Sequence, residues 1–582
     1  MLGYARREKA AFALQGLRGL RTALRLEEEV GAGLGRSAFL QRTMPPRTDR
    51  TPMKEPVQLV WFKRDLRADD HRPLAQAARR GPVLGLYLYE PDLHGSEEFT
   101  AAHVVFLNES LRSLQNSLRE LGGELVLRRG EAVSEMHALR REMPFAAVWS
   151  HEETGSDRTY RRDREVAAWC REQGIPWHEF RQDGVVRRLR SRQGWSGRWE
   201  KFMRKPATPR PVLRGVQGVR SDGILSPADL GLAASDKPEA QKGGAEEAQR
   251  TVTSFLTERG ANYRAAMSSP VEGWTACSRI SPYLSFGCLS LRAVADQLAA
   301  RRAALRQAEA AGAVVDRRWF GSLQSFGSRL RWHCHFMQKL EDEPRIEFQN
   351  FVRAYDGLRE EFTASPEGRR RFEAWKEGLT GYPMVDACIR CVKATGWLNF
   401  RMRAMLASFS AYHLWLHWRE PAVWLGSHFL DFEAGIHFSQ FQMQSGTSGI
   451  NTVRIYSPAK QAAEQDPEGE FIRRWVPELR DVPVSWLPRP EQMPAELQGR
   501  SGCVIGRDYP APIVEHAAAV RSARERIAAV RRRTTTRAEA QAVFVRHGSR
   551  KKSARRGVRK NKQPTLPGLG EAKGTEVAGE RL

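Results

Sequence analysis

VQLVWF (57–62) is the first of five short apolar runs that decide the fold of the N-terminal part of this chain. Helix-like segments separate the runs from one another. Short β-rich runs that alternate with helices form a parallel sheet covered on both faces, so we predict a doubly wound, five-stranded α/β domain. No G-x-G-x-x-G follows the first run, so the usual dinucleotide fingerprint is missing. The other runs are VLGLYLY (83–89), ELVLR (124–128), AAVWSH (146–151) and PWHEF (176–180).

The chain after the sheet divides by composition into further regions. A tryptophan-rich stretch predicts an all-helical domain, because its apolar residues recur at helical spacing and never alternate with period two. Its expected helices include 348–361 and 401–418. The predicted regions are a disordered extension or mis-assigned start at 1–54, the α/β domain at 55–185, a linker at 186–250, the helical domain at 251–510, and a terminal helix with a basic disordered tail at 511–582.

Length and composition favour a soluble protein of two or more domains. The chain has 582 residues, 41% of them hydrophobic, and no stretch reaches the ~18 apolar residues that a membrane-spanning helix needs. Its seven cysteines are an odd number, which favours free thiols in a reducing compartment. We therefore expect a cytoplasmic monomer, associated with the nucleoid if the source is bacterial.

The charge balance indicates a polyanionic partner. Lysine and arginine number 93 against 68 aspartates and glutamates, a net charge of +25. Residues 530–562 alone hold 13 lysines and arginines and one glutamate, so about half of the excess lies near the C-terminus. DNA is the expected partner and an anionic membrane surface the less favoured one. Contacts to phosphates should weaken steeply as salt rises.

The most specific motif is CSRISPYLSFGCLSLRA (277–293). Ser278 and Ser281 offer hydroxyls and Arg279 a guanidinium where the chain enters a helix, which suits a diphosphate. A serine-rich helix start is more often only a cap. The motif alone therefore leaves both interpretations open.

Three further strings change that balance: WFKRDLRADDHRPL (61–74), AWKEGLTGYPMVDACIRCVKATGWLNFRMRAMLASF (374–409) and HWREPAVWLGSHFLDFEAGIHFSQFQMQSGTSGINTVRIYSPAKQ (417–461). Together with 277–293 they resemble the photolyase/cryptochrome family of flavoproteins, from about Val57 to Leu487. The resemblance implies an antenna-type α/β domain and a helical domain that holds FAD. It also implies that the excited, reduced flavin passes an electron to a pyrimidine dimer in DNA. The sequence does not identify an antenna chromophore.

The resemblance assigns a set of cofactor contacts. Arg403 matches the arginine that pairs with Asp431 beside the isoalloxazine. Near a flavin that carries negative charge, a buried arginine needs such a carboxylate. The implied cofactor-binding residues are Tyr263, Cys277, Ser278, Arg279, Ile280, Ser281, Arg403, Asp431, Phe432 and Glu433.

The substrate side departs from the family pattern. Trp332, expected to stack on a flipped base, is present, but Arg329 stands where the family has a glutamate. At the position after Trp332, His333 stands where the family has an arginine. Asn399-Phe400 replaces a His-Asn pair, so the lesion-contacting asparagine is lost unless Asn399 substitutes for it. The implied DNA or substrate residues are Trp332, Arg401, Phe441 and Gln461.

The electron-feeding tryptophans are also altered. Trp418 matches the middle member of the family's chain of three and is, with Trp332, our candidate for electron transfer. The flavin-proximal position is Ser439, and the surface position falls near Ser365. Trp415 and Trp424 are alternatives, although aromatic residues on helices usually belong to the core. The residue that faces flavin N5 is expected among Gly435, Ile436 and His437.

No metal site is predicted. Cys388 and Cys391 have metal-ligand spacing, but they lie in one predicted helix without a second CxxC, which favours packing. His333 and His335 are two positions apart and cannot share a helix face.

These observations support three hypotheses. The first is a light-driven, FAD-dependent enzyme that splits pyrimidine dimers in DNA. The second is a blue-light photoreceptor of the same family that has lost repair. The third is a nucleic-acid-binding module whose flavin is only structural.

Overall fold

A computed structural model describes residues 55–235 and 237–548, which belong to one compact unit beginning at Glu55. The expectations for 1–54 and 549–582 lie outside the described residues.

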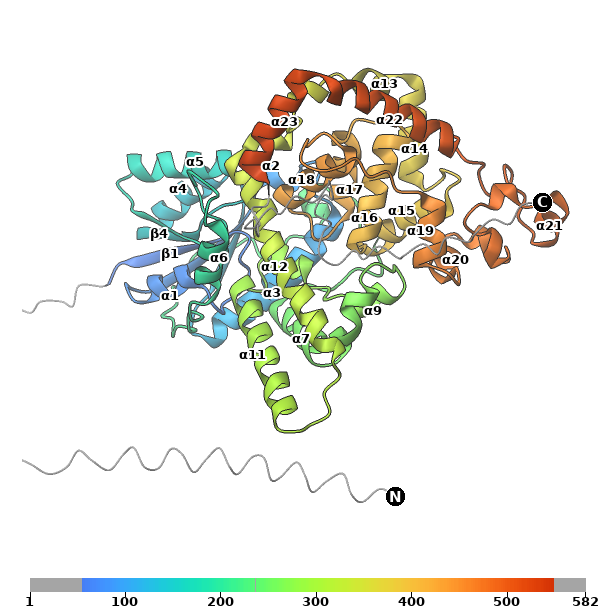
Figure 1. Cartoon of the computed structure of the whole chain (residues 1–582). Coiled ribbons are helices and arrows are strands. Elements are labelled where there is room, and N and C mark those ends of the chain that lie inside the picture. The colour runs from blue at the N-terminus through green and yellow to red at the C-terminus, as the bar shows by residue number, and fades with distance from the viewer. Residues whose placement is uncertain (1–54, 236, 549–582) are drawn as a thin grey trace, which may run out of the picture. The chain divides into compact units, whose positions relative to one another are not determined.

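The N-terminal part is a parallel sheet of five strands in the order β3-β2-β1-β4-β5 (Figure 1). The predicted fold class is confirmed. Chain order reverses between β1 and β4, and parallel sheets bind ligands beyond the strand ends at such a point. The strands are β1 (Val57–Phe62), β2 (Val83–Tyr89), β3 (Leu125–Arg129), β4 (Phe145–His151) and β5 (Trp177–Phe180).

The alternation of side chains along β1 builds two cores. Val60 and Phe62 belong to one apolar cluster, whereas Leu59 and Trp61 belong to another, and all four are fully buried. The helices that cover the first face are α1 (Arg72–Ala78) and α3 (Ala101–Glu120), and those that cover the second are α4 (Ala132–Glu142) and α5 (Asp157–Glu172) (Figure 1).

The rest of the described chain is helical. None of its helices combines the length and apolar character needed to cross a membrane, as far as the described residues go. The helices are α6 (Trp195–Met203), α7 (Ala245–Thr257), α8 (Tyr263–Ala266), α9 (Glu272–Ala276), α10 (Ser281–Ser285), α11 (Leu291–Ala310), α12 (Arg318–Asp342), α13 (Glu360–Ala364), α14 (Pro366–Glu377), α15 (Pro383–Thr395), α16 (Phe400–Ser408), α17 (Arg419–His428), α18 (Ala434–Ser445), α19 (Pro458–Gln465), α20 (Glu470–Trp475), α21 (Ala495–Arg500), α22 (His516–Arg532) and α23 (Thr534–His547).

Of two predicted helices, the one over 348–361 is wrong, and the one over 401–418 is confirmed only as far as residue 413. Over 348–361 the chain makes short turns, because Gly357 adopts φ +78° and the Asn350 side chain bonds Asp356. Over 401–418, α16 ends in a π-helical turn. Trp415 then adopts φ +58°, a left-handed backbone conformation that a right-handed helix cannot contain.

The predicted linker and the predicted disordered tail both contain helices. α6 forms within 186–250 because Trp195, Trp199 and Phe202 bury one of its faces. α23 forms within the basic segment, where Val543 is buried and His547 pairs with Glu343.

Hydrogen bonds join the loop after β1 to the helical part of the chain. The Arg67 guanidinium donates to the carbonyl oxygen of Gly287 at 2.9 Å, and the backbone N–H of Leu66 donates to that of Phe286 at 3.2 Å. Gly287 adopts φ +72°, and a Cβ there would lie 2.2 Å from the Arg64 carbonyl oxygen. Only glycine fits, so the loop after β1 is fixed against the segment between α10 and α11.

Candidate functional site

One cavity in the helical domain gathers most of the residues that the sequence singled out. The space in it that is open to water-sized molecules is about 340 Å³, which lies within the ~300–1,000 Å³ usual for small-molecule sites. α8, α10, α12, α16 and α18 contribute to its walls. The predicted residues that line it are Tyr263, Cys277, Ser278, Arg279, Ser281, Trp332, Arg401, Arg403, Asp431, Glu433 and Phe441.

Four predicted residues do not line this cavity, and the roles assigned to them stay predictions. Ile280 belongs to the core cluster on the sheet side. Phe432 lines a separate cavity at the strand ends. Gln461 is buried and accepts a 3.2 Å hydrogen bond from Arg401. Trp418 is fully buried in the helical core. In each case the side chain points away from the cavity and packs against other residues.

Arg279 is held rigidly at the cavity wall. Its guanidinium lies between two indole rings, 4.2 Å from the centroid of Trp274 and 4.0 Å from that of Trp397. Its Nε donates to Oε1 of Gln241 at 3.1 Å. Burial lowers the pKa of Arg279 to about 10, so it stays charged at neutral pH. With the hydroxyl of Ser278 nearby, this fixed cation supplies the donors that a diphosphate needs.

The wall of the cavity also carries an ion pair between Arg403 and Asp431. Arg403 donates to Asp431 through both terminal nitrogens, at 2.8 and 2.9 Å, and the predicted pairing is confirmed. Burial alone would raise the pKa of Asp431, but Arg403 and Ser281 bring it below its ordinary value. The Arg403 guanidinium also stacks 3.9 Å from the Phe429 ring centroid. This arrangement leaves a rigid, bidentate pair facing the cavity.

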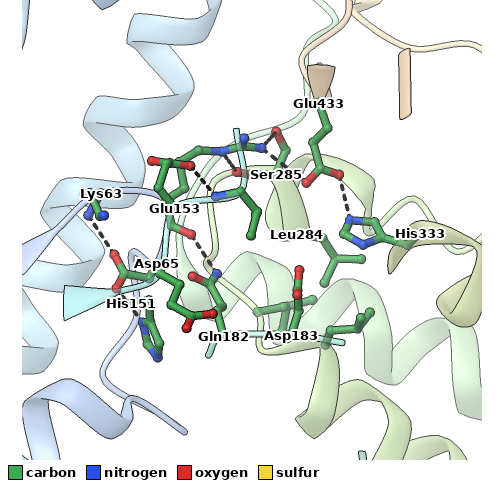
Figure 2. Close-up of a pocket in the computed structure, with 15 residues that line it drawn as sticks. Lys63, Asp65, His151, Glu153, Gln182, Asp183, Leu284, Ser285, His333 and Glu433 are labelled. Atoms are coloured by element: carbon green, nitrogen blue, oxygen red, sulfur yellow. Dashed lines mark hydrogen bonds and ion pairs between the residues drawn. The ribbon is translucent and has the colours of Figure 1, made fainter. Parts of the chain in front are cut away.

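Sequence reasoning missed the partners of Glu433. Its Oε2 lies 2.7 Å from Nε2 of His333, and its Oε1 lies 3.2 Å from a terminal nitrogen of Arg64 (Figure 2). Burial opposes both charges, yet the pairing raises the pKa of His333 well above its ordinary value and lowers that of Glu433. The only sequence signal for these contacts was His333, a histidine at a position where the family has an arginine.

The cavity mouth carries two arginines among aromatic rings. Arg329 lies 5.8 Å from the Phe400 ring centroid, and Arg401 enters from α16. Trp332 packs 5.5 Å from the ring of Phe336. This mouth combines cations with a stacking surface, as proteins that bind unpaired bases do.

Asn399 lines the cavity, and its Oδ1 has no hydrogen-bond partner among the described residues, but its Nδ2 is occupied. Its Nδ2 donates to the carbonyl oxygens of Met267 and Ser268, at 3.2 and 2.8 Å. The expectation that Asn399 could replace the lost asparagine is corrected for this donor, because the side chain fixes the loop after α8.

Of the three residues expected to face flavin N5, two line the cavity. Ile436 and His437 line the cavity, whereas Gly435 packs against Met337 of α12. His437 donates from Nε2 to the Ala422 carbonyl oxygen at 2.7 Å, and burial lowers its pKa to about 4. It is therefore neutral at physiological pH.

The tryptophan chain is interrupted. Ser439 is fully buried and its hydroxyl has no partner among the described residues. Trp418 donates from its indole nitrogen to Asn350 at 2.8 Å and packs 6.1 Å from the Phe438 ring. Of the alternatives, Trp424 stacks on Trp375. The role of Trp418 in electron transfer stays a prediction.

The cysteine pair has the environment of core residues. Cys388 and Cys391 are fully buried in α15 within the main helical cluster. Burial raises the pKa of Cys391 to about 12. These thiols stay protonated, which suits packing.

A smaller cavity, with about 110 Å³ open to water-sized molecules, lies at the carboxyl ends of β1 and β2. Phe432 closes it from the helical domain, and Tyr87, Phe99 and Arg162 line it from the sheet domain. Its place matches the ligand position of doubly wound sheets.

A doubly wound sheet joined to a helical domain, with a large cavity of fixed cations, defines a protein that binds a nucleotide cofactor. "DNA photolyase" matches residues 58–194 and "FAD binding domain of DNA photolyase" matches residues 326–529. A deoxyribodipyrimidine photo-lyase of Streptomyces griseus is 30% identical over 489 residues, covering 80% of this chain and 97% of that relative. This chain belongs to the photolyase/cryptochrome family, and its helical domain is the FAD-binding domain of that family.

Other relatives carry both functional names. A cryptochrome DASH of Gloeobacter violaceus is 27% identical over 496 residues, covering 80% of this chain and 94% of that relative. A class III photolyase of Agrobacterium tumefaciens shares the fold with a TM-score of 0.71 at 23% identity, covering 83% of this chain and 99% of that one. An archaeal photolyase of Sulfolobus tokodaii with two FAD molecules shares it with a TM-score of 0.65 at 24% identity, covering 81% and 100%.

Proposed function

We propose that this protein is a light-driven DNA-repair enzyme that splits pyrimidine dimers by electron transfer from FAD. The bound cofactor supplies the electron when its reduced form is excited. The protein supplies the site: Arg279 and Ser278 for the diphosphate, and the Arg403–Asp431 pair beside the ring system. The basic balance of +25 favours DNA as the partner.

The observation that carries the proposal is the mouth of the cavity. Trp332 offers a stacking face for a flipped base, and Arg329 and Arg401 place two cations beside it. A dimer that receives an electron becomes negatively charged, and a guanidinium can donate hydrogen bonds to its carbonyl oxygens. The change from glutamate to Arg329 therefore alters how a lesion is held while leaving a group that stabilises its charge.

Illumination of the purified, flavin-loaded protein with an oligonucleotide containing one dimer tests the proposal. Loss of the dimer under blue light, measured by chromatography and absent in the dark, is the expected result. Trp332→Ala should weaken binding of that oligonucleotide by ~1–3 kcal/mol of stacking, while binding of undamaged DNA stays the same. Unchanged dimers in the presence of fully reduced flavin would eliminate the enzyme.

A second candidate function is a blue-light photoreceptor. Ser439 in the tryptophan chain and Arg329 in the pocket favour it. It is distinguished by light-induced changes in flavin redox state that occur without any change in dimer content.

The cavity at the strand ends is the place we propose for an antenna chromophore. It is separate from the flavin cavity, and its aromatic walls, Tyr87 and Phe99, suit a planar ring. An absorption band besides that of FAD, lost in a Phe99→Ala variant that keeps its FAD, would support this placement. An absorption spectrum of FAD alone from a protein made in its native host would contradict it.

A further inference from the structure

His333 and Glu433 each line two cavities, and Figure 2 shows them side by side in one of these. One is the flavin cavity, and the other is a small polar pocket between the sheet domain and the helical domain, with about 40 Å³ open to water-sized molecules. Among the described residues, no others line both. The charged or titratable residues of the polar pocket are Lys63, Arg64, Asp65, His151, Glu152, Glu153, Asp183, His333 and Glu433.

The contacts of His333 form a continuous series of proton-carrying groups. Nε2 lies 2.7 Å from Oε2 of Glu433 as an ion pair whose angle is not that of a hydrogen bond, so the ring must turn slightly to align the two atoms. Nδ1 is buried without a hydrogen-bond partner among the described residues. A carboxylate oxygen of Asp183, a ring nitrogen of His333 and Sγ of Cys334 lie within 4.8 Å of one another. One bridging water is enough to connect a carboxylate and an imidazole at that separation.

The surroundings keep this ring chargeable. The charged or titratable groups that face it are Glu433 from the start of α18, Asp183 from the loop after β5 and Cys334 from its own helix, with Arg64 behind Glu433. Burial raises the pKa of Asp183, so this carboxyl holds a proton more readily than an ordinary aspartate does. Histidine is the side chain best suited to give and take a proton in this range.

We propose that His333 carries protons from the polar pocket to the flavin cavity. Nδ1 takes a proton from the pocket, directly or through Asp183, and Nε2 passes one to Oε2 of Glu433. One proton from solvent then accompanies each electron that an external one-electron reductant without protons of its own, such as ferrocyanide, gives to the illuminated flavin, and no bond between heavy atoms changes. The proposal rests on the flavin site and is independent of whether the protein repairs DNA.

An arginine in this place would keep the ion pair and abolish the transfer. A guanidinium remains protonated at any physiological pH, so it neutralises Glu433 but cannot release a proton to it. His333→Arg therefore separates the electrostatic role from the proton-carrying role. His333→Gln removes the charge as well and serves as a second variant if the larger side chain prevents folding.

The test measures proton uptake during photoreduction. Flavin-loaded protein is illuminated with ferrocyanide, which gives electrons without releasing protons, in weak buffer, and an indicator dye reports the uptake while absorbance reports the flavin. In His333→Arg we expect uptake to slow at least tenfold, with flavin content and the oxidised spectrum unchanged. His335→Gln is the matched control, because that histidine is on the same helix and lines neither cavity. It should behave as the unaltered protein does.

A second readout needs no flavin. Histidine ¹⁵N spectra of the flavin-free protein, with the His333 signal assigned by its loss in His333→Arg, should show a ring that titrates above the ordinary histidine range. Uptake at the original rate in His333→Arg, or in His333→Gln if the arginine variant does not fold, would overturn the proposal. Normal, His333-dependent uptake together with unrepaired dimers would leave it standing and remove only the repair function.

Discussion

At the residue scale, the Arg403–Asp431 ion pair of the flavin cavity allows the most direct test. Asp431→Asn keeps the shape of the side chain but removes the charge opposite Arg403. Because breaking a buried pair costs ~3–5 kcal/mol, we expect a large loss of thermal stability and of FAD content. Differential scanning calorimetry and the ratio of flavin to protein absorbance check this. Asp316→Asn, which breaks an exposed pair with Arg318, is the control and should change neither.

Lys339 predicts a pH dependence of stability. It is buried on α12, and burial together with Arg192 lowers its pKa from the ordinary 10.5 to about 7. Between these values the unfolded chain binds more protons than the folded one, so this residue makes stability rise with pH. Lys339→Met should therefore be more stable than the unaltered protein at pH 7, and the advantage should shrink by ~1–3 kcal/mol towards pH 9.

Urea unfolding at several pH values measures that difference. Lys460→Met, at an exposed lysine of α19, is the control and should show no such trend. An advantage of Lys339→Met that is equal at pH 7 and pH 9 would contradict the assignment.

At the element scale, the crossing of α12 and α18 depends on Gly435. A Cβ there would lie 2.8 Å from Cα of Met337 and 3.3 Å from Cβ of Leu340. Gly435→Ala should therefore destabilise the protein by ~1–3 kcal/mol through overpacking. Gly197→Ala in α6 meets nothing within 4 Å and should instead stabilise by ~0.5–1 kcal/mol. Equal unfolding midpoints for both variants in urea would refute this account of the crossing.

The sequence predicted the elements whose signal is local. The five apolar runs and the helical segments between them indicated the sheet, because strands that are buried on both faces are apolar along their whole length. Helix 348–361 failed because a turn at Gly357 and a side-chain bond of Asn350 outweighed helical spacing. The Arg403–Asp431 pair was predictable only from the family resemblance, since the two lie 28 positions apart. The interaction of His333, Glu433 and Arg64 joins three distant segments and left no local signal.

At the scale of the whole molecule, charge outside the cavity should govern non-specific DNA binding. Removing residues 549–582 deletes ten lysines and arginines and three glutamates, a net +7. Affinity for undamaged duplex should fall, and the plot of log K against log salt should become shallower by ~0.9 for each phosphate that the shortened chain no longer neutralises. Fluorescence anisotropy across a salt series checks this. Identical slopes for the full and shortened chains would show that the tail binds no phosphates.

The position of Arg279 between Trp274 and Trp397 has an electronic consequence. Withdrawing an electron from either indole would create a hole about 4 Å from a permanent cation. Two such charges repel by ~4 kcal/mol at an effective dielectric constant near 20. Both rings are therefore poor sources of electrons although Trp397 borders the cavity. Holes produced by light will settle on other aromatic residues, and this pair will remain unoxidised under illumination.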